Sequence, residues 1–454
     1  MTTALLLQMI LAAFGAVVLY TIIGFIPGTD ETAVLMPISL ALIMSGAHPM
    51  FVLTFFMAAV VNLKLTNLMP TALVGLPGGV LSSPMIPHAF HLKNRGLSAV
   101  TVKKMASGAL LGTLVSVPTS MILANLLIPF ASTIQPYAPL LFVGGAIFLA
   151  LIGKNKLLAL ISILPLSILF MSLRHLYWGT GVIEEGVNIT TSFFLGITSG
   201  PLILTLLSLL NKNTRDEQLT DNVNEIKISS KLDIMTTMNP FKIMTKKERV
   251  ATIIPAFIAN FLFVLSPVGL IILFGDIVSS RIKDKDQKAM TTITVMSALA
   301  QSTYLSGLII PILALGIPLS PAAVGPGSAL FNAPPIFTVD NNIYHVLTTN
   351  QKMFAMLLGI VIAAVTSYIL INRFAGKISR FILEKIPHEA VLGLFVSFVI
   401  LLAYMDAGWI NVFGVLLIGL ACGTLNKMGV NYGIQFMTLY ASPWIIEQLS
   451  MLAR

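Results

Sequence analysis

Charged residues are scarce in this 454-residue chain. Asp, Glu, Lys and Arg make up 10% of it, whereas an average soluble domain is about a quarter charged. Hydrophobic residues make up 56% and the mean hydropathy is +0.92, which excludes a soluble globular protein. Several apolar stretches approach or exceed the ~20 residues that cross a bilayer as helix: residues 4–26, 99–128, 189–210, 250–275 and 353–372. Because the alternating ~10-residue segments of a membrane barrel are lacking, the sequence predicts an all-α polytopic membrane protein.

The residues that usually carry cofactor or catalytic chemistry are also few. The single cysteine, Cys422, lies in an apolar run, which excludes a disulfide framework and a thiolate metal site. His48, His88, His91 and His175 are not at metal-ligand spacing. The chain has no Ser-His-Asp arrangement placed to act and no phosphate-binding GxxxxGK[ST] loop. We therefore expect no enzyme activity, no ATP-driven step, no metal and no cofactor.

Positive charge exceeds negative charge, with a net value of +9. The Lys and Arg residues occur in short clusters between apolar segments, which is typical of cytoplasmic loops and does not indicate a nucleic-acid partner. Residues 1–20 lack a basic leader and a cleavage site, so we expect a retained helix there. The long polar stretch 211–249 is predicted to be a cytoplasmic linker between an N-terminal transmembrane repeat, residues 1–210, and a C-terminal one, residues 250–454.

The two halves share a pattern of Gly and Pro. PTALVGLPG beginning at Pro70 and PILALGIPL beginning at Pro311 place Pro, Gly and Pro in register at one offset of 241 residues. Residues 93–104 are rich in Lys and Arg, whereas their counterparts, residues 334–345, contain none. Opposite basic character in equivalent loops predicts an inverted-topology repeat. Arg174 is the exception, because this scheme places it on the outer side.

Each duplicated block is expected to break its helix. Proline removes an amide donor and clashes with the preceding turn, so GLPGG at residues 75–79 and GIPLSP at residues 316–321 should be unwound, re-entrant tips within the membrane. A lone Gly-x-Pro is more often a packing kink, but broken helices at matching places in inverted halves are typical of a transporter's substrate site. The amides at a half-helix N-terminus would bind a carboxylate or phosphate.

Polar residues near these blocks are the candidate binding groups. Lys64 could neutralise an anionic substrate, or it could snorkel to the interface or pair with Asp30 or Glu31. Asp30 and Glu31 could bind Na⁺ or H⁺, or cap a helix. The neutral side chains could instead join helices. Substrate binding is assigned to Lys64, Thr66, Asn67, Gly75, Pro77, Gly78, Gly79, Ser82, Ser302, Thr303, Gly316, Pro318 and Ser320. Ion coupling is assigned to Asp30, Glu31 and Gln301.

Four segments carry a resemblance to a known family. GFIPGTDETAVLMP (24–37), ALVGLPGGVLSSPMIPHAFHLKNRG (72–96), GLIIPILALGIP (307–318) and GTLNKMGVNYGIQFMTLYASPWIIEQ (423–448) resemble the large permease subunit of tripartite tricarboxylate transporters. The resemblance implies an inner-membrane permease for citrate and other organic acids, driven by an ion gradient. It also implies a small membrane subunit and an extracytoplasmic solute-binding protein as partners.

These observations predict a secondary transporter of small organic anions in the cytoplasmic membrane, coupled to Na⁺ or H⁺ and working by alternating access. Substrate would be held between the two Gly-Pro tips. Three alternatives stay open: a transporter of another anion such as a lipid-linked phosphate, an intramembrane enzyme, and a non-transporting receptor subunit. The oligomeric state stays open as well.

Overall fold

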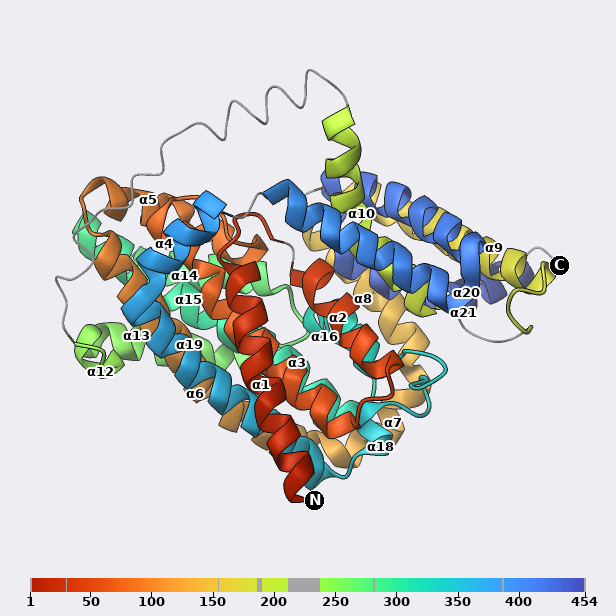
Figure 1. Cartoon of the computed structure of the whole chain (residues 1–454), viewed down its shortest axis with the longest axis horizontal. Coiled ribbons are helices and arrows are strands. Elements are labelled where there is room, and N and C mark those ends of the chain that lie inside the picture. The colour runs from red at the N-terminus through yellow and green to blue at the C-terminus, as the bar shows by residue number, and fades with distance from the viewer. Residues whose placement is uncertain are drawn as a thin grey trace.

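The computed structural model describes residues 2–29, 31–153, 155–185, 190–210, 237–280, 282–385 and 388–452. These residues form helices and connecting loops, and no strand occurs among them (Figure 1). The helices of the first half are α1 Thr3–Gly24, α2 Glu31–Met44, α3 Pro49–Thr66, α4 Leu68–Leu73, η1 Val80–Met85, α5 Ile86–Asn94, α6 Ser98–Leu127, η2 Ile128–Phe130, α7 Ala131–Ile134, η3 Gln135–Tyr137, α8 Ala138–Ile152, α9 Lys156–Gly179 and α10 Thr190–Leu210. Those of the second half are α12 Pro240–Ile243, α13 Lys246–Phe261, α14 Pro267–Ser279, α15 Lys285–Ile310, the π-helix η5 Pro311–Leu315, α16 Pro321–Val324, α17 Ser328–Phe331, α18 Ile343–Val346, α19 Thr349–Lys385, α20 His388–Lys427 and α21 Tyr432–Leu452.

Seven helices of the described part are long and apolar enough to cross a membrane: Thr3–Gly24, Pro49–Leu73, Ser98–Thr133, Lys156–Gly179, Lys285–Leu315, Thr349–Ile382 and Gly393–Lys427. Four shorter apolar helices accompany them. The outer faces are apolar too, as the exposed side chains of Leu157, Ile161 and Ile168 on α9 illustrate. An all-α, multi-pass membrane protein, as predicted from the composition, is confirmed.

The long helices form two groups. In Figure 1, α8, α9, α20 and α21 lie on one side of the molecule, and α5, α6, α13 and α19 lie on the other. Helix α10 packs against α20 and so belongs to the first group, in which α21 packs against α8 and α9. The short helix α2 contacts α3 of one group and α10 and α20 of the other, so it joins the two groups.

In the second group, which also contains α3 and α15, helices of the first half pack against helices of the second half. Helix α3 packs along α19, where Thr54 Oγ1 donates to the Ala355 carbonyl at 3.1 Å. Helix α6 of the first half packs in turn along α15 of the second, where Ser116 Oγ donates to the Ser302 carbonyl at 3.0 Å. Each half therefore supplies one long helix to support the other half's broken helix. The inverted relation between the halves stays a prediction.

The basic clusters gather at one end of the second group. Asp286, at the start of α15, pairs with His91 at 2.7 Å and with Arg95 at 3.1 Å, at the end of α5. Lys104 near the start of α6 pairs with Glu248 near the start of α13 at 2.5 Å. A capping box between Thr245 and Glu248 starts α13 at Lys246, inside the stretch predicted to be linker. Four element ends thus meet on one side, which is the arrangement expected of a cytoplasmic face.

Candidate functional site

The first interruption follows α4, which ends at Leu73. Residue Gly75 has φ +84°, a left-handed conformation that favours glycine, and the chain becomes helical again at Val80. The loop after α1 pairs with this segment, because the Gly28 amide donates to the Pro77 carbonyl at 2.7 Å and the Thr29 amide donates to the Gly78 carbonyl at 3.0 Å. The interruption is therefore held against the beginning of α2.

Ser82 closes this interruption from within. The amides of Gly78 and Gly79 both donate to Ser82 Oγ at 3.1 Å, and Ser82 is buried. These amides, which the sequence suggested as anion donors, are satisfied by a serine oxygen in this conformation. An incoming carboxylate would have to replace that oxygen to use them.

The second interruption follows the π-helix η5. Gly316 has φ +68° and its carbonyl accepts from Asn342 Nδ2 at 2.9 Å, so a later loop supports the break. Ser320 caps α16 by accepting from the Ala323 amide at 3.1 Å, and its own hydroxyl donates to the Gly307 carbonyl. Pro318 lies between them and is buried. The chain is thus non-helical at residues 74–79 and 316–320, where the Gly and Pro of the two duplicated blocks lie, while the role of these segments in binding stays a prediction.

Lys64 lies on α3, two residues before that helix ends at Thr66, and is 3% exposed. It forms an ion pair with Glu31, the first residue of α2, which is also buried. Its Nζ lies 3.5 Å from the centroid of the Tyr304 ring on α15. The pairing of Lys64 with an acid, one of the alternatives weighed above, is the one that the structure has. Asp30, the other candidate acid, lies outside the described residues.

Asn67 and Gly79 extend this group toward the first interruption. A Cβ placed on Gly79 would lie 2.9 Å from Asn67 Nδ2 and 3.1 Å from Glu31 Oε1, so a larger residue there would displace both side chains. Asn67 is 3% exposed, and neither atom of its amide has a hydrogen-bond partner within the described chain. The side-chain amide of Gln301 on α15 likewise has no hydrogen-bond partner within the described chain, and Gln301 is 1% exposed.

The two amides are each three residues from a member of the Lys64–Tyr304 contact. Three contacts join this part of the first half to α15: Lys64 with Tyr304, Met85 with Ser297, and His91 with Asp286. As the residue number rises on the first segment, it falls on α15. The two segments are therefore antiparallel. Asn67 is one turn beyond Lys64, and Gln301 is one turn before Tyr304, on the same faces. Each amide is therefore within one helical turn, along its own helix, of the Lys64–Tyr304 contact between the halves.

Other predicted residues are directed elsewhere. Thr66 Oγ1 donates within its helix to the Asn62 carbonyl at 2.9 Å and lies against α1. Thr303 Oγ1 donates to the Leu299 carbonyl at 2.7 Å, and Ser302 Oγ lies 3.4 Å from the same carbonyl. These hydroxyls satisfy themselves on helix backbone, so in this conformation they offer little to a ligand.

Tyr304 is the site residue that the sequence interpretation missed. It directly follows Gln301, Ser302 and Thr303, and a phenol among polar residues on one buried helix was the available signal. Tyr304 belongs to the site because its ring contacts Lys64, a residue of the other half, and the sequence does not show which side chain of the other half faces Tyr304. Among the described residues, no group of three or more His, Cys, Asp or Glu side chains could hold a metal ion.

Fold and site together define a multi-pass membrane protein with a buried ion pair and two unsatisfied amides where its halves meet. The model of the tripartite tricarboxylate transporter TctA family matches residues 10–434, so the chain belongs to that family of membrane transporter components. No curated protein and no solved structure matches it significantly.

Proposed function

We propose that this chain is the permease of an ion-coupled secondary transporter for small organic anions of the di- or tricarboxylate class. The observation that carries the proposal is that the buried amides of Asn67 and Gln301, each within a helical turn of the Lys64–Tyr304 contact, have no hydrogen-bond partner among the described residues. An unsatisfied buried polar group costs roughly 1–3 kcal/mol, so a fold that keeps two of them near one buried ion pair is typical of a ligand site. Amide donors and an ammonium group together suit a carboxylate.

The ion pair supplies a coupling mechanism. Lys64 is neutralised by Glu31, and a substrate carboxylate that takes the place of Glu31 leaves a second negative charge in the same buried space. Isolated charge is expensive at this depth, so Glu31 must then bind H⁺ or be neutralised by Na⁺. Substrate and coupling ion would therefore bind together. Gln301 and the carbonyls of the first interruption would complete the ion site.

Alternating access would use the two helix groups. Helix α2 carries Glu31 at its first residue and contacts both groups, so movement of one group relative to the other would act on the ion pair. The exchange of helices between the halves, α3 with α19 and α6 with α15, is what an inverted repeat would produce. In this scheme the two Gly-Pro interruptions open in turn to opposite sides.

The basic end of the molecule would face the cytoplasm, with the linker at residues 211–249 on the same side of the cytoplasmic membrane. The carbonyl of Thr237, near the end of that linker, accepts from Lys103 Nζ at 3.1 Å, which supports this placement. The family description names a tripartite system, so we expect a small membrane subunit and an extracytoplasmic solute-binding protein as partners.

Uptake by purified protein in liposomes tests the proposal. Labelled citrate and succinate would be offered under imposed Na⁺ or H⁺ gradients, with Lys64→Met vesicles as the matched control. We expect gradient-dependent uptake that Lys64→Met abolishes. Saturable binding without flux, in protein shown to be folded and supplied with its partner subunits, would favour a receptor. Chemical turnover of the acid would favour an enzyme, and flux of a lipid-linked phosphate alone would favour the other anion class.

A further inference from the structure

A large groove lies between α13 and α14, away from the two interruptions. Its volume is about 960 Å³, at the upper end of the ~300–1,000 Å³ range of small-molecule sites. Both helices pack along α15, whose Gln287 and Thr291 line the groove from below. Figure 1 shows α13, α14 and α15 together on the side of the molecule that the second helix group occupies.

The mouth of the groove carries an excess of positive charge. It is formed where α13 begins, α14 ends and α15 begins, and its charged residues are Lys246, Lys247, Glu248, Lys283 and Asp284. Both acids already have partners. Glu248 pairs with Lys104, which does not line the groove, and Asp284 caps α15 by accepting from the Gln287 amide at 2.8 Å. The three lysines are exposed and form no ion pair within the part of the chain that the structure describes. The mouth therefore offers three cations to an anion.

Beyond the mouth the walls of the groove are apolar. Val250, Ile254 and Ile258 follow one face of α13, and α14 contributes Phe274 and Ile277. Val250 is 56% exposed and Ile254 is 53% exposed, so the described chain leaves this face uncovered. From Val250 to Ile258 the face rises about 12 Å, at ~1.5 Å per residue. One leaflet contributes half of a hydrocarbon core about 30 Å thick, so the wall matches the depth of acyl chains in a single leaflet.

This length and the separation of charge from apolar surface select the occupant. A transmembrane helix of a partner subunit would cross the full ~30 Å of the core, which is more than twice the length of this wall. A free phosphate would contact the lysines and leave the exposed isoleucines uncovered. A phospholipid with an anionic headgroup matches both parts, because basic pockets between membrane helices bind such headgroups.

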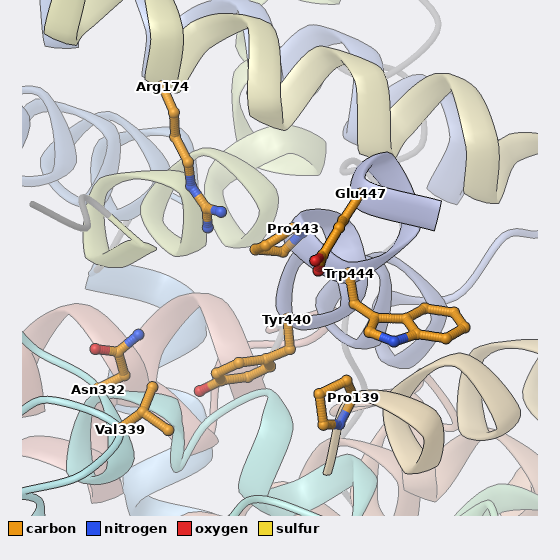
Figure 2. Close-up of a pocket in the computed structure, with 8 residues that line it drawn as sticks. All are labelled: Pro139, Arg174, Asn332, Val339, Tyr440, Pro443, Trp444 and Glu447. Carbon is orange, nitrogen blue, oxygen red and sulfur yellow. The ribbon is translucent and has the colours of Figure 1, made fainter. Parts of the chain in front are cut away.

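A smaller cavity, of about 340 Å³, differs in both respects (Figure 2). Arg174 and Glu447 both line it, so it presents charges of opposite sign. Figure 2 shows Val339 beside Asn332 and Pro443 beside Glu447, so polar and apolar groups are mixed along its wall. That lining does not suit an amphiphile, whereas the groove between α13 and α14 does.

We propose that this groove binds an anionic phospholipid, with its phosphate among Lys246, Lys247 and Lys283 and an acyl chain along the apolar face of α13. In the orientation proposed above the lipid belongs to the cytoplasmic leaflet, whose anionic lipids attract basic segments. The chemistry of the groove depends neither on that orientation nor on transport.

Lipid retention by the full chain in detergent tests the proposal. Delipidated protein would be mixed with dioleoylphosphatidylglycerol or dioleoylphosphatidylcholine, which share their acyl chains and differ in headgroup charge. Bound lipid would be counted by native mass spectrometry. We expect the phosphatidylglycerol to bind at least about tenfold more tightly, because each lysine near an anionic headgroup strengthens binding by about fivefold. It should also raise the unfolding temperature of the protein, because the ligand binds the folded state.

The lysines are tested by the triple variant Lys246→Gln, Lys247→Gln, Lys283→Gln, which should lose the preference for phosphatidylglycerol. The matched control also removes three exposed lysines, none of which lines the groove, and should keep the preference: Lys156→Gln, Lys242→Gln, Lys427→Gln. Equal binding of the two lipids by the parent protein overturns the proposal. So does a preference that the groove variant keeps, or that the control loses to the same extent.

The apolar wall is tested by Ile254→Trp, which fills the groove and should weaken binding of phosphatidylglycerol about tenfold. Ile253→Trp is the matched control, because Ile253 is exposed on the same helix but does not line the groove. An equal loss in both variants would show that the acyl chain lies elsewhere and overturns the proposal. Glycerol 3-phosphate, which has the phosphate without the chains, should not displace the lipid. Displacement by it would assign the lysines to a free phosphate instead. Thermal unfolding of each variant confirms that it is folded.

Discussion

Lys64 of the first half lies over the ring of Tyr304 of the second, with Nζ 3.5 Å from the ring centroid. The same ammonium group pairs with Glu31, so one buried cation of α3 contacts both α2 and α15. A cation bound to an aromatic face keeps part of its stabilisation when its carboxylate partner leaves. This arrangement lets the acidic partner of Lys64 change from a side chain to a ligand without leaving the charge wholly unsatisfied.

Replacing Glu31 by Gln should uncouple transport from the ion gradient. The variant presents a permanently neutral partner to Lys64, equivalent to the protonated acid, so the substrate carboxylate no longer needs an accompanying cation. We expect exchange of internal for external acid to persist in liposomes while accumulation driven by a Na⁺ or H⁺ gradient is lost. Glu31→Asp, which keeps the charge, is the control and should retain some gradient-driven uptake. Full accumulation by Glu31→Gln would contradict the coupling role.

Removing the Lys64 partner also has a cost in stability. Breaking a buried ion pair by deleting one member typically costs about 3–5 kcal/mol, although the Tyr304 ring offsets part of it. Glu31→Gln should therefore unfold at a lower temperature than the parent protein. The double variant Glu31→Gln, Lys64→Met should recover most of the loss, because no unpaired charge remains. Thermal unfolding in detergent measures the unfolding temperatures of the single and the double variant. A double variant that unfolds at the same temperature as Glu31→Gln would show that the unpaired Lys64 charge is not the cause of the lost stability.

Asn67→Leu and Gln301→Leu should lower substrate affinity while raising stability. Each removes a buried amide that has no hydrogen-bond partner within the described chain, so the fold loses an unsatisfied group rather than a contact. We expect binding of the acid to weaken by about tenfold or more, and the unfolding temperature to rise. Scintillation-based binding and thermal unfolding of the same preparations test the two effects together.

Asn62→Leu is the matched control for this pair of effects. Asn62 is equally buried, but its amide accepts from Ser367 Oγ at 2.6 Å and from Thr21 Oγ1 at 3.2 Å, and donates to the Val17 carbonyl at 3.0 Å. Its replacement leaves those partners unsatisfied, so stability should fall. If all three variants were destabilised alike, Asn67 and Gln301 would be ordinary packing residues.

The comparison of Asn62 with Asn67 illustrates what the sequence could supply. Gly-Pro spacing predicted where the helices break, because the backbone limits of proline and glycine are local. Asn62 and Asn67 flank Lys64 in the sequence and look alike, yet one is fully bonded and the other is not. Packing between distant segments decides which face of α3 lies against α1 and which lies against α15. A single sequence does not contain this information.

The same reason explains the residues that were missed or that face elsewhere. Lys64 and Glu31 were proposed as partners because both are charges in an apolar region, where charge must be neutralised. Tyr304 carries no such signal, and Thr66 is directed to α1 although it neighbours Asn67.

The predicted inversion of the halves can be tested with the chain's own single cysteine removed. In a Cys422→Ser background, Asn94→Cys at the end of α5 and Ile336→Cys in the loop after α17 place one thiol after each interruption, in segments that the sequence register makes equivalent. Because inverted halves put equivalent loops on opposite sides, an impermeant maleimide should label Ile336→Cys from outside the cell and Asn94→Cys only after the membrane is opened. Labelling of both from one side would exclude inversion.

Gly79→Ala should abolish uptake in a protein that still folds. The added Cβ would lie 2.9 Å from the Asn67 amide nitrogen and 3.1 Å from Glu31 Oε1, so both side chains must shift within the proposed binding space.

Gly78→Ala differs, because its Cβ would lie 1.8 Å from the Asn67 backbone carbonyl oxygen, which cannot move freely, and this variant should be unstable. Gly15→Ala on α1, where nothing lies within 4 Å, controls for the substitution itself. We expect near-normal unfolding with no uptake for Gly79→Ala, a lowered unfolding temperature for Gly78→Ala, and neither change for Gly15→Ala. Normal uptake by Gly79→Ala would place substrate away from Asn67 and Glu31.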